Sequence, residues 1–114
     1  MDNMNFEQEK TGAVVFVTMP GESFEAAMVL DFKHNIAPVV EENTRVVFDL
    51  SSIRFLDSMG CGAFLTCHRR LKEKGGKMGL CCAQKPVSAI FDLMGFPKIF
   101  DVFKTREEAL KAYG

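Results

Sequence analysis

The sequence has no marked excess of either charge, no apolar run long enough to cross a membrane, and no tryptophan. Its 14 Lys and Arg residues nearly balance its 15 Asp and Glu residues, so the formal net charge is only -1. A general nucleic-acid binder carries a basic excess, as does a protein attracted to an anionic membrane surface, so we expect neither partner. No apolar stretch approaches the ~20 residues that a transmembrane helix needs.

An apolar signal core is also missing from the first residues. This segment is polar and includes Glu7 and Glu9, whereas a secretory signal peptide has a continuous apolar region of about 7–15 residues. We therefore expect a cytoplasmic protein. At 114 residues the chain fits one domain with a modest core, and we expect residues 1–114 to form that single domain as a monomer.

The spacing of the four cysteines does not match a metal or redox motif. None of them forms the C-x-x-C pattern of a zinc or thioredoxin-like site, and cytoplasmic thiols stay reduced. All four lie in apolar helical or strand patterns. We interpret them as small core residues and expect no metal and no cofactor; they are Cys61, Cys67, Cys81 and Cys82.

Runs of β-branched and aromatic residues predict the strands of an α/β fold. Residues 13–18 form one such run, and residues 45–50 form another that is typical of a strand buried on both faces. The polar residues 6–10 are a candidate first edge strand. Residues 77–82 and 99–103 complete the set. Because a helical pattern separates residues 45–50 from 77–82, we expect a parallel βαβ unit with a right-handed crossover.

Helical spacing predicts four helices between and after these strands. The first starts near Glu25, and Pro38 is expected to end or kink it because proline lacks an N–H, with Val39 and Val40 in a short following turn. The second covers residues 58–74. A third carries the apolar face of Val87, Ile90, Phe91 and Met94 and stops at Gly95, and a fourth opens with a capping box at Thr105-Arg106-Glu107-Glu108. The predicted order is β-β-α-β-α-β-α-β-α, a mixed sheet of about five strands with about four helices.

The segment from Val46 to Gly62, VVFDLSSIRFLDSMGCG, carries the candidate functional residues. Its buried strand places Asp49 at a carboxyl end, where function concentrates in α/β sheets. A loop over residues 51–57 then places Asp57 and Ser58 at the start of the second helix. A helix N-terminus has unpaired N–H groups and partial positive charge, so it would accept a phosphate on Ser58. Such a phosphate adds up to two negative charges to the surface around it.

A helical wheel divides the second helix into two faces. We assign one face to the core, and it consists of Cys61, Phe64, Leu65, His68 and Leu71. The opposite face carries Ser58, Met59, Gly62, Thr66 and Arg69, and together with Asp57, directly before the helix, it is the predicted partner-binding surface. Gly60 and Gly62 each cost a helix about 1 kcal/mol relative to alanine. A tight interface is one explanation for tolerating that cost.

Each candidate also has a purely structural interpretation. Ser58 or Asp57 would serve as an N-cap and nothing more, and Asp49 would be a carboxylate that caps a loop. His68 lies on an apolar face and is interpreted as a satisfied core histidine rather than a catalytic one. His34, the other histidine, lies on a different helix, so we expect no catalytic residues.

The same segment resembles the STAS domain of bacterial anti-sigma factor antagonists. The signature of that family is a buried strand ending in Asp-Leu-Ser, followed after a few residues by Asp-Ser-x-Gly. Here these motifs are Asp49-Leu50-Ser51 and Asp57-Ser58-Met59-Gly60. The region from Val87 to Ala112 is similar to the C-terminal pattern of the family. Two positions next to the motif serine depart from the family pattern: Met59 replaces a small hydroxyl residue, and Cys61 replaces a branched aliphatic one.

The resemblance implies a partner switch rather than an enzyme. Members of the family bind an anti-sigma factor that is also a serine kinase, and this binding frees a sigma factor for transcription. The kinase phosphorylates the motif serine, here Ser58, and the complex dissociates, after which a serine phosphatase resets the switch. Asp57 corresponds to the acidic motif residue that helps hold the loop, and Asp49 supports the loop. Met59 would retune the choice of partner.

Two other functions stay open on the residues alone. One is an adaptor subunit of a stress-signalling or lipid-transport complex, which would use the same surface without modification of Ser58. The other is a small enzyme or nucleotide binder. Against it, the sequence has no Gly-rich phosphate loop after a strand and no Cys-His or Ser-His pair close in sequence.

Overall fold

A five-stranded mixed sheet forms the centre of the computed structural model, which describes residues 5–114 and so leaves the first four residues of the expected domain outside the described part. The strand order is β1-β2-β4-β6-β7. Strand β1 (Glu7–Thr11) pairs antiparallel with β2 (Val14–Thr18). The remaining strands are parallel neighbours: β4 (Arg45–Asp49), β6 (Lys77–Cys81) and β7 (Asp101–Phe103).

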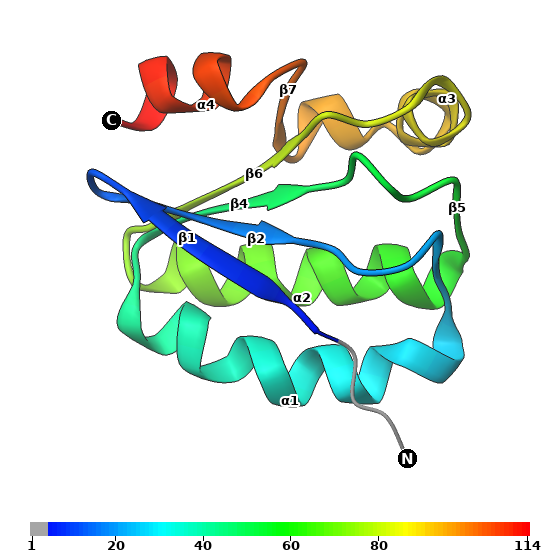
Figure 1. The fold of residues 1–114 in the computed structure, drawn as a ribbon, viewed down its shortest axis with the longest axis horizontal. Helices are drawn as coiled ribbons and strands as arrows, with labels where there is room; N and C mark the ends of the chain where they lie inside the picture. The colour runs from blue at the N-terminus through cyan, green and yellow to red at the C-terminus, as the bar shows by residue number, and fades with distance from the viewer. Residues whose placement is uncertain (1–4) are drawn as a thin grey trace.

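Helices cover both faces of this sheet (Figure 1). Helices α1 (Ala26–Glu42) and α2 (Ser58–Glu73) lie side by side below it, and α4 (Arg106–Tyr113) lies above it. Helix α3 (Lys85–Met94) and a 3-10 turn (Phe96–Lys98) follow β6. The predicted α/β fold, with its five-stranded mixed sheet and four helices, is therefore confirmed. None of the helices in residues 5–114 is long and apolar enough to span a bilayer.

The alternation of side chains along the strands separates two apolar clusters. Val46 and Phe48 belong to the large core between the sheet and helices α1 and α2. Val47 belongs to a smaller cluster with Ala109 and Tyr113 of α4. Aromatic rings fill the large core. The Phe24 ring lies 4.8 Å from that of Phe32 and 5.1 Å from that of Phe64, centroid to centroid. These contacts hold the beginnings of α1 and α2 against each other.

Of the two predicted effects of Pro38, ending or kinking the first helix, the first does not occur. Helix α1 continues through Pro38 to Glu42. Pro38 is exposed, whereas Val39 and Val40 are buried. The burial of these two side chains offsets the single backbone hydrogen bond that a proline removes.

The segment over residues 51–57, predicted as a loop, contains a short strand. Strand β5 (Phe55–Leu56) pairs in parallel with β3 (Ser23–Phe24), which the sequence analysis did not predict. Each strand has only two residues, too few to show alternation.

The last strand, β7, is shorter than predicted, because the 3-10 turn occupies part of the segment before it.

The capping box of α4 is confirmed in one half only. The Glu108 N–H donates to Oγ1 of Thr105 over 3.1 Å. The Glu108 carboxylate, however, accepts from the N–H of Lys104, one residue before the cap. Of the two N–H groups that a capping box satisfies, only that of Glu108 is bonded as predicted.

Candidate functional site

Asp57 caps two helices at once. Its Oδ1 accepts a hydrogen bond of 2.9 Å from the Gly60 N–H in the first turn of α2, and its Oδ2 accepts one of 3.0 Å from the Ala26 N–H at the start of α1. The two helices begin at the same end of the molecule, as Figure 1 shows. These hydrogen bonds, with that from Gly60 contributing most, lower the pKa of Asp57 below its ordinary value. The carboxylate is therefore ionised and held between two helix N-termini.

Ser58 is the first residue of α2 and is exposed. Because Asp57 provides the cap, the structural interpretation of an N-cap applies to Asp57 and not to Ser58. Among the described residues, no hydrogen bond engages the Ser58 hydroxyl. Its position next to the N-termini of α1 and α2 places it in a region of positive potential. The hydroxyl is therefore accessible and is not needed to hold the helix.

A hollow of about 220 Å³ lies next to Ser58, between α1 and α2. Its floor includes the position of Gly62, where an added Cβ would find no heavy atom within 4 Å. Met59, with 53% of its surface exposed, stands at the rim. The full lining is Val29, Lys33, Ser58, Met59, Gly62, Ala63 and Thr66. We call this feature the α1–α2 hollow.

The α1–α2 hollow brings together most of the predicted partner-binding surface. Ser58, Met59, Gly62 and Thr66 all line it, although Gly62 and Thr66 are half-buried. The Thr66 hydroxyl donates to the Gly62 carbonyl over 3.1 Å, so it is not free to bind a partner. Arg69 is exposed further along α2, outside this hollow. Helix α1 adds Val29 and Lys33, which the sequence analysis missed because no local pattern indicates which helix lies beside α2.

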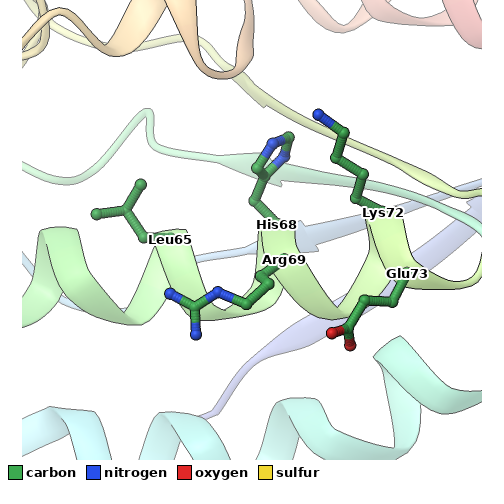
Figure 2. A pocket seen from close by; sticks show the side chains of 5 residues that line it. All are labelled: Leu65, His68, Arg69, Lys72 and Glu73. Carbon is green, nitrogen blue, oxygen red and sulfur yellow. The ribbon is translucent and has the colours of Figure 1, made fainter.

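A second, larger hollow of about 370 Å³ lies around the last turns of α2. Figure 2 shows its lining residues, Leu65, His68, Arg69, Lys72 and Glu73, all on this one helix. Leu65 and His68 were assigned to the core, but both are only half-buried. The wheel is right about Cys61, Phe64 and Leu71, which are buried. Leu65 nevertheless packs against the large core from the edge of this face.

His68 is not the satisfied core histidine that was expected. Its ring packs edge-on against Phe100, with 5.1 Å between centroids. Its Nδ1 is buried and, within residues 5–114, has no hydrogen-bond partner. Burial, and then the nearby Lys72 ammonium, lowers the pKa of His68. The Asp101 carboxylate opposes this shift in the pKa but does not reverse it, so the imidazole is mainly neutral near pH 7, and within residues 5–114 no hydrogen bond at Nδ1 orients it as a base.

Gly60 has an internal explanation rather than an interface role. A Cβ at this position would lie 2.4 Å from the Phe24 carbonyl oxygen of β3. The start of α2 therefore approaches the β3 backbone so closely that only glycine fits. Of the two helical glycines, only Gly62 is still explained by a tight interface with a partner.

Asp49 lies in a separate polar cluster toward α4. Its Oδ1 accepts from the Ser51 N–H over 2.9 Å, and its Oδ2 accepts from Nε of Arg106 over 2.7 Å. Burial alone would raise the pKa of Asp49, but the hydrogen bonds from Arg106 and Ser51 lower it overall. Arg106 also donates to Glu9 and Thr18. Asp49 thus supports the start of the loop through Ser51, and no hydrogen bond in the described residues connects it to Ser58.

The cysteines are free, and three of the four are buried. The sulfurs of Cys81 and Cys82 and a carboxylate oxygen of Asp49 lie within 4.8 Å of one another. This arrangement is poorly suited to a cation, because the guanidinium of Arg106 already occupies the carboxylate. Burial also raises the pKa of both thiols, and a metal ligand must be a thiolate.

Comparison with known proteins places this geometry in context. The family model of the STAS domain matches residues 5–109. The anti-sigma F factor antagonist of Paenibacillus polymyxa is 27% identical over 109 residues, covering 95% of this chain and 93% of the relative. An anti-sigma factor antagonist from Mycobacterium paratuberculosis superposes with a TM-score of 0.84 at 23% identity, covering 96% of this chain and 92% of the other.

A further solved structure bears on Ser58. The Bacillus cell fate determinant SpoIIAA in its phosphorylated form superposes with a TM-score of 0.71 at 21% identity, covering 95% of this chain and 98% of the other. At such identities the structural matches show a shared fold. That SpoIIAA exists in a phosphorylated form is a property of that protein.

Proposed function

The chain belongs to the STAS domain family, whose anti-sigma factor antagonists are its relatives, and from that premise we propose that it is a phosphorylation-controlled antagonist of an anti-sigma factor. In the unphosphorylated form, the α1–α2 hollow binds an anti-sigma factor that is also a serine kinase. Phosphorylation of Ser58 releases this partner, and a serine phosphatase restores binding. Anti-sigma factor antagonists are non-enzymatic regulators, so the domain is the substrate of the kinase.

The observation that carries the proposal is the exposed, unbonded hydroxyl of Ser58 at the rim of the α1–α2 hollow. A kinase needs an accessible hydroxyl, and Ser58 provides one without loss of a helix cap, because Asp57 supplies the cap to both helices. The phosphorylated form of the structurally similar SpoIIAA supports the same conclusion.

The surroundings of Ser58 would tolerate a phosphate. The N-termini of α1 and α2 converge there, and each contributes partial positive charge. Lys33 lines the same hollow and offers an ammonium group. The Asp57 carboxylate next to Ser58 repels the added charge, whereas the helix N-termini and the Lys33 ammonium attract it. Because of these attractions, we expect phosphorylation to leave the fold intact.

The same phosphate would disrupt partner binding. It adds up to two negative charges and a bulky group at the rim of a hollow whose floor at Gly62 is open. A partner that packs into this hollow would have to desolvate the phosphate or lose its contact there. Such a loss at an interface costs about 2–5 kcal/mol, which corresponds to a drop in affinity of about 30-fold or more.

The experiment compares the wild-type domain with Ser58→Asp and Ala112→Asp in capture from lysate of the source cell. Ala112→Asp adds the same charge to an exposed position of α4, on the other face of the sheet. We expect the wild type and Ala112→Asp to capture an ATP-binding kinase, and Ser58→Asp to fail while its unfolding free energy stays within about 0.5 kcal/mol of the wild type.

ATP added to the captured complex provides the second readout. We expect a gain of one phosphate on Ser58 and release of the partner. Equal capture by all three forms, without any phosphate on Ser58, would reject the switch and favour the adaptor subunit. Unfolding of Ser58→Asp would instead show that the start of α2 does not tolerate negative charge.

A further inference from the structure

Two adjacent thiols, those of Cys81 and Cys82, face each other at the carboxyl end of β6. Their sulfurs are 3.6 Å apart. Consecutive side chains of a regular strand point to opposite faces, so two neighbouring cysteines in a continued strand would hold their sulfurs apart. Something in the backbone must therefore bring these two side chains together.

That feature is the left-handed conformation of Cys82. Its φ is +64°, and it is the one non-glycine residue with positive φ in residues 5–114. A side chain in this region costs about 1–2 kcal/mol relative to the ordinary right-handed conformation. Glycine would adopt it freely. The chain thus holds a cysteine in a strained conformation at the position where its sulfur meets that of Cys81.

The two thiols differ in access. Cys81 is completely buried, whereas Cys82 is half-buried. Cys82 is therefore the sulfur that a small solute would reach first, with Cys81 directly behind it. The remaining pair, Cys61 and Cys67, lies six residues apart in α2, and both are buried.

We propose that Cys81 and Cys82 form a reversible oxidation site, at which hydrogen peroxide oxidises the two adjacent thiols to a vicinal disulfide. In the first step, the deprotonated fraction of Cys82, which is small because burial raises the pKa of this thiol, attacks one peroxide oxygen slowly. The O–O bond breaks, an S–O bond forms, and the second oxygen leaves as water with the thiol proton. This step leaves a sulfenic acid on Cys82.

The second step needs no conformational search, because the Cys81 sulfur is already in contact. It attacks the Cys82 sulfur, an S–S bond forms, and the S–O bond breaks. The hydroxyl leaves as water with the proton of Cys81. In total the two thiols lose two electrons and two protons, and one peroxide is reduced to two waters.

The resulting disulfide is expected to be easily reduced. Adjacent α-carbons are about 3.8 Å apart, which is shorter than the usual separation of about 4.4–6.8 Å in disulfides. Strained disulfides have more oxidising potentials and belong to the labile class. A small thiol such as dithiothreitol should therefore restore both cysteines.

The sequence provides a matched internal control for the test. Because trypsin does not cleave before Pro86, Cys81 and Cys82 fall in one peptide, residues 78–98, while Cys61 and Cys67 fall together in residues 55–69. The folded protein is treated with equimolar hydrogen peroxide, denatured, alkylated and digested. We expect peptide 78–98 to lose two hydrogens and to escape alkylation, peptide 55–69 to be alkylated twice, and dithiothreitol to reverse the change.

Two variants complete the design. Cys82→Ser removes the accessible sulfur and should abolish the loss of two hydrogens, whereas Cys67→Ala should retain it. Stable sulfinic or sulfonic acid on Cys82, a disulfide in peptide 55–69, or a dimer on a non-reducing gel in place of the internal bridge would overturn the proposal. Full alkylation of peptide 78–98 after peroxide treatment would overturn it as well.

Discussion

Two glycines of α2, Gly60 and Gly62, are separated by a single residue and should respond in opposite directions to the same substitution. A Cβ at Gly60 would lie 2.4 Å from the Phe24 carbonyl oxygen and 3.2 Å from the Phe24 carbonyl carbon. A Cβ at Gly62 would meet nothing within 4 Å. Gly60→Ala therefore forces two backbones apart, whereas Gly62→Ala only improves helix propensity.

The magnitudes follow from these surroundings. Overpacking of a close contact costs about 1–3 kcal/mol. At Gly60 the displaced carbonyl also accepts the Asp57 N–H over 3.2 Å, and losing that bond costs about 1 kcal/mol more. Helix propensity returns at most about 1 kcal/mol in either variant. We expect Gly60→Ala to destabilise by about 1–3 kcal/mol and Gly62→Ala to stabilise by up to about 1 kcal/mol.

Urea unfolding followed by circular dichroism measures both free energies, and thermal unfolding checks their order. At about 4 °C per kcal/mol for a domain of this size, the two melting temperatures should differ by roughly 4–16 °C. Equal stabilisation by both substitutions would refute the close approach of β3 to α2. Destabilisation by Gly62→Ala would refute the open floor of the α1–α2 hollow.

Three further outcomes are expected. Gly62→Gln should keep the fold but weaken capture of the partner at least tenfold by filling the α1–α2 hollow, and unchanged affinity in a titration would remove Gly62 from the interface. Arg106→Met should cost about 3 kcal/mol at pH 7 because it leaves Asp49 buried and unpaired. Since the folded pKa of Asp49 is lowered, the stability from this pair is present above its unfolded pKa near 4 and is lost as pH falls through the folded value, so the deficit of the variant should shrink in acid urea titrations. His68→Phe should be neutral or stabilising by about 1 kcal/mol because it removes an unpartnered buried nitrogen, and clear destabilisation would reveal a polar partner of Nδ1.

The sequence by itself determined the order of the main strands and helices, the α/β class, and the position of Ser58 at the start of a helix. Apolar periodicity decides such features, because a strand or helix that must bury one face needs a fixed spacing of apolar residues. The buried strand before Ser58 was visible for the same reason, whereas the motif Asp57-Ser58-Met59-Gly60 was identified by its resemblance to the STAS family. Where local pattern and tertiary packing compete, as at Pro38, packing decides, and the helix does not end there.

Only the tertiary structure decided which groups from distant segments meet. The bond from Ala26 to Asp57 spans 31 residues, and that from Arg106 to Asp49 spans 57, so no local pattern indicates either of them. The different roles of Gly60 and Gly62 depend on the position of β3, a strand of two residues that is too short for periodicity to reveal. The contact of Cys81 with Cys82 goes together with a positive φ at Cys82, which intrinsic propensity disfavours and a sequence pattern does not reveal. Spacing along the chain fixes which faces are buried, whereas contacts between faces arise only when the helices pack on the sheet.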